Sequence, residues 1–232
     1  MVRRFMDSRI LYLDEDVLKL AAHLKWRVIA FTVSRTGDLQ ELKEFKEKGR
    51  KMGLDVTSRL DIVTSSIGEL KGKLLSMRRN FELIGVYPLN IEVARTAARD
   101  NKVDFLVLPS DLKLKVFDEG VASLMENSKV LLEVDLVPLI EQECSSRLLR
   151  LYRRAYDVAK KHRVKVVFAS GAKAPLELRA PRDLAALASL ITLDEEKALN
   201  GLSTIPLTRL TLNRSKLRSG FILPGVSIAE ED

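Results

Sequence analysis

Short apolar segments alternate along the chain with longer segments in which apolar residues recur every three or four positions. The short segments have the length and apolar character of buried parallel strands. The clearest are Val28–Val33, Leu83–Tyr87, Asp104–Leu108, Val130–Val134 and Val164–Ala169. Phe5–Ile10 and Asp55–Val63 are weaker candidates of the same kind. The pattern therefore predicts about seven strands.

The intervening segments begin at residues that commonly cap helices. An acidic, amide or hydroxyl residue precedes each expected helix, in chain order Asp14, Asp38, Asn90, Asp118 and Ser145 or Ser146. These helices are expected to reach about Trp26, Met52, Asp100, Asn127 and Lys161. Beyond Ala169 we expect a loop, then helices over 181–190, 194–202 and 207–212, and a polar, basic segment over 213–219.

Alternation of strands and helices predicts a mainly parallel sheet, either an open doubly wound sheet or a barrel. A glycine-rich dinucleotide-binding turn does not follow the first strand, which weakens the open nucleotide-binding alternative. We therefore expect a single TIM-barrel-like α/β barrel over residues 1–220, with extra helices. Residues 221–232 are expected to form an acidic C-terminal tail.

The composition agrees with a folded chain, because 46% of the 232 residues are hydrophobic and 31% are charged. One cysteine, no expected signal peptide and no apolar run of membrane-spanning length favour a cytoplasmic protein. The net charge is +7, and residues 145–220 hold 16 Lys/Arg against six Asp/Glu. Such a block favours a polyanionic partner such as nucleic acid, although basic helices can also be merely solvated.

Residues for metal-dependent hydrolysis are scarce. His23 and His162 are the only histidines and fit no zinc-binding motif, so both are expected to be structural or surface residues. Carboxylates in or near strands offer magnesium ligands, but pairing with nearby cations is the alternative. The carboxylates are Asp7, Asp61, Glu133 and Asp135, and the cations are Arg3, Arg9, Arg59 and Lys129. We expect neither a catalytic residue nor a metal ligand in this chain.

The most distinctive segment is F-A-S-G-A-K-A-P-L-E-L-R-A-P-R-D-L, residues 168–184. Its small residues permit a close approach of backbone or partner, and Pro181 suits the first turn of a helix. The cations Lys173, Arg179 and Arg182, with Asp183 at the positive helix end, predict a basic rim that binds phosphates. Alternatively, Asp183 only caps the helix and Glu177 only pairs with Arg179.

This segment resembles the signature of the archaeal and eukaryotic ribonuclease P protein family whose archaeal member is called component 3. That family shows an aromatic strand end, a serine-rich loop and then E-x-R-x-P-x-D; Gly171 stands where serine is often found. Further similarities are D-F-L-V-L-P at 104–109, L-S-T-I-P at 202–206, Asn213-Arg214, and Arg95 and Ala97 in an R-x-A helix.

The resemblance implies a phosphoesterase-related barrel without its metal ligands, which acts as a non-catalytic subunit of ribonuclease P. Its partners would be the ribonuclease P RNA, precursor tRNA and a small ferredoxin-like protein subunit, assembled as a heterotetramer. No cofactor would be bound by this chain, and Mg²⁺ would enter through the RNA. The implied RNA or partner contacts are Lys173, Arg179, Arg182, Asp183, Arg95, Arg214, Lys216 and Arg218. A stand-alone metal phosphoesterase and a protein scaffold without RNA contact remain the alternatives.

Overall fold

Seven parallel strands form one sheet in which each strand pairs with the next strand along the chain. The computed structural model describes residues 3–33, 38–141, 145–217, 221–223 and 226–227. Every strand that the apolar pattern predicts is present, within two residues of its expected bounds. The strands are β1 (Met6–Ile10), β2 (Val28–Val33), β3 (Asp55–Thr64), β4 (Leu83–Pro88), β5 (Phe105–Leu108), β6 (Leu131–Asp135) and β7 (Val166–Ala169).

The first and last strands meet, which curls the sheet into a nearly closed barrel. Ile10 forms a parallel bridge with Ala172. The amide of Leu11 donates to the carbonyl of Ala172 (2.8 Å), and the amide of Gly171 donates to that of Arg9 (3.0 Å). The predicted TIM-barrel-like fold is confirmed, and the open doubly wound sheet is wrong.

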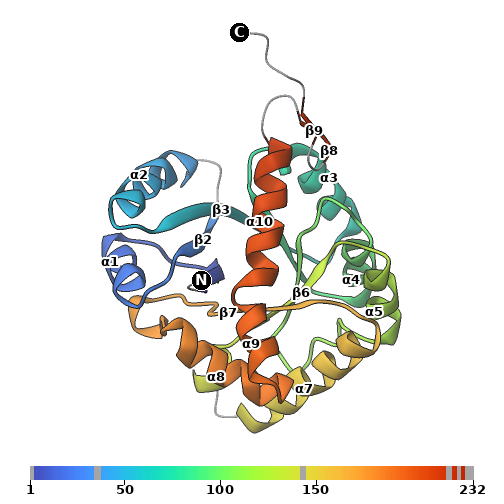
Figure 1. The fold of residues 1–232 in the computed structure, drawn as a ribbon. Helices are drawn as coiled ribbons and strands as arrows, with labels where there is room; N and C mark the ends of the chain where they lie inside the picture. The colour runs from blue at the N-terminus through green and yellow to red at the C-terminus, as the bar shows by residue number, and fades with distance from the viewer. Residues whose placement is uncertain (1–2, 34–37, 142–144, 218–220, 224–225, 228–232) are drawn as a thin grey trace.

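Helices surround the barrel as an outer layer (Figure 1). They are α1 (Glu15–His23), α2 (Asp38–Lys51), α3 (Ile67–Met77), α4 (Ile91–Ala98), α5 (Glu119–Glu126), α6 (Pro138–Glu141), α7 (Ser145–Lys161), α8 (Pro181–Thr192) and α9 (Glu195–Gly201), with the short 3-10 helix η1 (Pro175–Glu177) before α8. The predicted caps Asp14, Asn90 and Asp118 each accept a backbone N–H from the first turn, and Asp194 does the same for α9. The helix expected to reach Trp26 ends at His23, because Lys25 adopts a positive φ of 71°.

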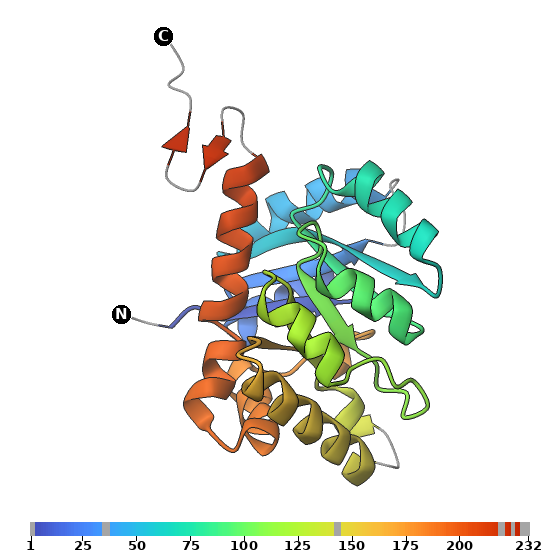
Figure 2. The ribbon, with the colours of Figure 1, turned by 90° about the vertical axis from the view of Figure 1, so that its right-hand side faces the viewer.

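The last long helix, α10 (Thr204–Leu217), lies across the amino-terminal ends of the strands (Figures 1 and 2). Asn213 Nδ2 donates to the carbonyl of Glu82 (2.9 Å), just before β4, and to Asp104 Oδ1 (2.8 Å), just before β5. Leu210 packs with inward-facing strand residues such as Met6 and Phe105 in a small core inside the barrel. The helix expected over 207–212 is longer, and Pro206 lies in its first turn, where proline is tolerated.

Most of the apolar core lies between the strands and the outer helices. Two short antiparallel strands, β8 (Phe221–Leu223) and β9 (Val226–Ser227), follow α10 within the segment expected to be an acidic tail. Residues 224–225 and 228–232 of that segment lie outside the described residues. In the part of the chain that the structure describes, each helix is too short or too polar to cross a membrane.

Candidate nucleic-acid interface

Two buried arginines occupy the barrel interior. Arg59 is fully buried; its Nη1 and Nη2 contact the Glu133 carboxylate at 2.7 and 2.5 Å, and its Nε donates to Asp61 Oδ1 at 2.7 Å. Arg9 Nε donates to the other oxygen of Asp61 (2.6 Å), and Arg9 Nη1 donates to Asp135. The interior is therefore a network of ion pairs that reaches toward the carboxyl-terminal mouth of the barrel.

The network explains the protonation behaviour of its acids. Burial alone would raise the pKa of Asp61, but the neighbouring charges of Arg59 and Arg9 lower it below its usual value. Burial raises the pKa of Asp7 to about 6, and hydrogen bonds from Ser170 and from the Arg9 N–H (3.3 Å) offset only part of this rise. Burial likewise raises the pKa of Asp135 to about 6 despite the opposing charge of Arg9.

Three of the four candidate magnesium ligands bind arginine, whereas Asp7 accepts the backbone N–H groups of Ser170 and Arg9. Asp61, Glu133 and Asp135 pair with Arg9 and Arg59, which was the alternative interpretation. Within the described ranges, no group of three or more His, Cys, Asp or Glu side chains is arranged to hold a metal ion.

The two histidines are likewise placed as surface residues of helices. His23 lies in the last turn of α1. His162 pairs with Glu119 across the surface, through Nε2 and Oε2 at 2.5 Å.

Two glycines make room for this network. A Cβ added to Gly85 would lie 2.4 Å from both Arg59 Nη2 and Asp61 Oδ1. One added to Gly171, which has a positive φ of 67°, would lie 2.7 Å from Asp135 Cγ. Gly171 is thus required by the position of Asp135, and a serine at this position would collide with it.

The three cations of the predicted basic rim follow β7 in the chain. Lys173 is exposed just beyond β7, at the mouth of the barrel. Arg179 lies farther along, where its carbonyl accepts the Trp26 indole N–H (3.0 Å) next to the amino-terminal end of β2, and its guanidinium donates to the carbonyls of Leu176 and Leu178.

The remaining cation and the acid of this rim lie on α8. Arg182 lines a shallow depression of about 270 Å³ between α8 and α9. Asp183 is exposed in the first turn of α8, and no side chain caps that helix. Lys173 and Arg179 thus lie in the connection from β7 to α8, Arg182 is the second residue of α8, and their contact with phosphate stays a prediction.

Three further predicted contacts lie on other elements. Arg95 is half exposed on α4, and its Nη2 is 3.5 Å from Asp118 Oδ2. Arg214 on α10 binds Asp55 through both Nη atoms (2.6 and 2.8 Å) and Glu82 Oε1 through Nε (2.7 Å). These bonds hold α10 to the barrel. Arg218 lies outside the described residues.

Lys216 lies in a cluster of cations that outnumber the acidic group they surround. Asp104 is buried at the amino-terminal end of the barrel, where Arg78 Nη1 lies 3.4 Å and Arg209 Nη1 lies 3.7 Å from its carboxylate. Desolvation, then the nearby charges of Lys129 and Arg209, lower the pKa of Lys216. Because like charges are held together here, this end of the barrel favours the approach of an anion.

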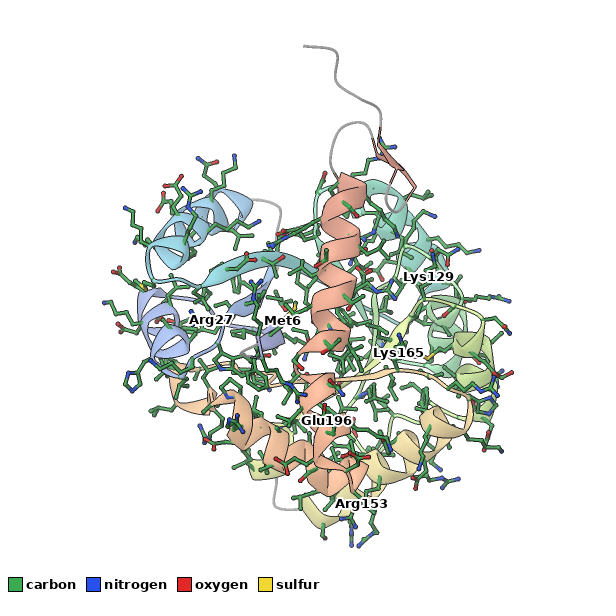
Figure 3. All side chains as sticks on the ribbon, in the orientation of Figure 1. Met6, Arg27, Lys129, Arg153, Lys165 and Glu196 are labelled. Carbon is green, nitrogen blue, oxygen red and sulfur yellow. The ribbon has the colours of Figure 1, made fainter. Side chains whose placement is uncertain are left out.

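A groove beside α10 extends this basic surface. Lys129 and Lys165 lie on the same side of α10 (Figure 3) and line a cavity of about 400 Å³ with Thr208, Arg209 and Leu212. A second cavity of about 470 Å³ continues from it, sharing Arg163, Val164, Lys165, Thr204 and Ile205. We call these joined cavities the α10 groove. Its apolar and cationic lining is complementary to a nucleic-acid strand, which carries charged phosphates and flat apolar bases.

The basic block is visible in the sequence, but this groove is not. Arg163 and Lys165 lie inside the block, whereas Lys129 comes from residues 1–144, in which 23 Lys/Arg balance 23 Asp/Glu. A usable signal was position, because Lys129 and Lys165 each come directly before a buried parallel strand. Such residues gather at the amino-terminal end of a barrel.

Comparisons with known proteins agree with this fold and length. The sequence model of the family described as RNase P subunit p30 matches residues 4–219. Ribonuclease P protein component 3 of Methanosarcina barkeri is 25% identical over 94% of this chain and 90% of the relative. The component 3 protein of Methanococcus maripaludis is 28% identical over 94% of this chain and 95% of the relative.

A solved structure matches as well. A chain in a cryo-EM structure of archaeal ribonuclease P with mature tRNA superposes with a TM-score of 0.84 and 24% identity, covering 98% of this chain and 99% of that one. This likeness supports the barrel and its length. Since the family match spans nearly the whole barrel, α10 included, the chain belongs to the RNase P subunit p30 family.

Proposed function

We propose that this chain is a cytoplasmic protein subunit of ribonuclease P, in which it supports RNA-catalysed removal of 5′ leaders from precursor tRNA. The proposal combines the family membership with the unbalanced cations of the amino-terminal end of the barrel. In the described interior Asp61, Glu133 and Asp135 pair with arginine, and we assign the chemistry to the RNA and the Mg²⁺ that the RNA binds.

The observation that carries the proposal is the α10 groove. Among the described residues, Lys129 and Lys165 form no salt bridge, and both are directed to the same side of α10 (Figure 3). Lysines that bind phosphate release counterions from the RNA, which makes affinity fall steeply with salt. By screening phosphate repulsion, this surface would stabilise a compact RNA fold at lower Mg²⁺.

The protein partner is also part of this proposal. We place a small ferredoxin-like subunit of the same enzyme on this chain and expect a heterotetramer. The exposed cations Lys173 and Arg182, which lie away from the α10 groove, remain predicted contacts to RNA or to that subunit.

Omission reconstitution tests the function. Cognate RNA and the other protein subunits are assembled with and without this chain, and precursor-tRNA cleavage is measured at limiting Mg²⁺. Omission should lower the cleavage rate and raise the Mg²⁺ requirement. Unchanged cleavage without the chain would refute the proposed function.

A charge variant tests the surface. Lys129→Gln with Lys165→Gln should weaken RNA binding and reduce the slope of log affinity against log salt by about 1 to 2. Lys43→Gln with Lys71→Gln, two exposed lysines on α2 and α3, removes the same charge elsewhere and is the control. Equal effects of the two pairs would show that net charge, and not the groove, attracts the RNA.

A further inference from the structure

One half of the α10 groove has the composition of a nucleotide site. The 470 Å³ cavity is lined by the buried residues Tyr156, Val164, Val166 and Phe168 and by Ile205. Pockets that bind small molecules commonly measure about 300–1,000 Å³ and combine an apolar lining with a few placed polar groups. Asn200 supplies such a group: its Oδ1 accepts the Thr204 hydroxyl and its Nδ2 donates to Glu196 Oε1, both at 3.3 Å, and each atom keeps capacity for one more hydrogen bond.

Cations surround this cavity. Lys160, Arg163, Lys165 and Lys197 all line it, and all four are exposed. Lys197 pairs with Asp194 (2.8 Å), whereas the other three form no salt bridge among the described residues. Phosphate groups carry permanent negative charge, so the rim is complementary to a nucleic-acid backbone.

The backbone at one of these cations is unusual. Arg163 follows the end of α7 with a positive φ of 56°, a conformation in which glycine is the usual residue after a helix. The turn is held by the amide of Val164, which donates to the carbonyl of Ala159 (2.8 Å). An arginine in this strained position places a guanidinium at the junction of the two cavities of the groove.

We propose that this cavity, lined by Val164, Ile205, Asn200 and the four cations, binds one unpaired nucleotide of the RNA held in the α10 groove. The base would lie on the apolar lining with its polar edge toward Asn200, while the flanking phosphates meet Lys160, Arg163 and Lys165. Sequence-specific RNA recognition usually targets such splayed-out bases, because the major groove of an RNA helix is too narrow to read. The inference rests on the proposed function and adds to it the kind of RNA segment that is bound.

Thr204 offers a test that changes no charge. It is exposed at the start of α10 and lines this cavity, so Thr204→Phe would fill the space for the base. Thr211, one and a half to two turns farther along the same exposed helix face, lines neither cavity of the groove, and Thr211→Phe is the matched control.

The full-length chain is titrated with a 10-nucleotide oligouridylate and with an RNA duplex of the same length. The wild type and Thr211→Phe should prefer the single strand, and Thr204→Phe should bind it about tenfold more weakly while binding the duplex unchanged. Lys165→Gln should weaken both and lower the salt slope. Circular dichroism of each variant confirms that the fold is retained.

Three results would overturn the proposal: no preference of the wild type for the single strand, an equal loss on both RNAs in Thr204→Phe, or unchanged single-strand binding in that variant. Binding of an acidic peptide that is lost in Thr204→Phe, without single-strand binding, would instead assign the pocket to a protein partner. In each case, omission reconstitution still reports separately on the proposed function, because it does not depend on Thr204.

Discussion

The interior ion pair between Arg59 and Glu133 gives the sharpest prediction about stability. Arg59→Met removes a fully buried guanidinium that donates to the Glu133 carboxylate, to Asp61 and, at 2.6 Å, to the carbonyl of Ser8. Glu133 then keeps one side-chain donor, the Ser8 hydroxyl at 2.6 Å. A buried carboxylate left without its cation costs about 3–5 kcal/mol.

A second substitution removes the unpaired carboxylate as well, so that the site is again neutral. Arg59→Met with Glu133→Leu removes both charges, and buried pairs replaced by apolar residues are often close to neutral in stability. The double variant should therefore be more stable than Arg59→Met alone, which is opposite to the sum expected for independent sites. In both variants Asp61 keeps its ion pair with Arg9, whose Nε donates to Asp61 Oδ2 (2.6 Å).

Urea unfolding followed by circular dichroism measures these differences. Lys71→Met, at an exposed position on α3, is the control and should change stability by less than about 0.5 kcal/mol. A cost below about 1 kcal/mol for Arg59→Met would mean that water or a rearranged partner satisfies Glu133. A double variant less stable than the single one would show that shape, and not charge, dominates this site.

Two further predictions concern the same interior. Asp7→Asn should stabilise the protein relative to wild type at pH 7.5 but not at pH 4. The folded pKa of about 6 exceeds the usual 3.8, so the wild type loses roughly 2–2.5 kcal/mol as the pH rises from 4 to 7.5, and parallel pH–stability curves would refute this. Gly171→Ala should lower the free energy of unfolding by about 1–3 kcal/mol, because of its positive φ and the Asp135 carboxylate 2.7 Å from the new Cβ. Thermal melting that is unchanged by this substitution would show that Asp135 moves aside.

The strands were predictable because each is a short apolar run, and parallel strands are buried on both faces. Helix α3 was not predicted, since Gly68 and Gly72 weaken its pattern and it buries only Leu70 and Leu74. Its start nevertheless carries a cap, in which Ser66 Oγ accepts the amide of Glu69 (3.3 Å). The capping residue was therefore present in the sequence, but the apolar periodicity after it was too weak to predict the helix.

The candidate site was predictable in charge but not in place. A run of cations in the sequence does not show at which end of the barrel each side chain lies. Lys173, at the carboxyl-terminal mouth, and Lys216, at the amino-terminal end, were therefore grouped although the barrel separates them. Arg214 shows a second limit, because its partners Asp55 and Glu82 precede it by more than a hundred residues. Only the closed barrel brings those acids next to α10.

The position of α10 has a consequence for biogenesis. Its polar partners lie at the starts of β3, β4 and β5, and Leu210 packs with residues of β1, β2 and β4 to β7, so α10 has no complete docking surface until the whole barrel has formed. During synthesis, α10 emerges after all seven strands of the barrel and can dock only once they have assembled. The groove beside this helix therefore exists only on finished molecules, which would keep incomplete chains from competing for RNA.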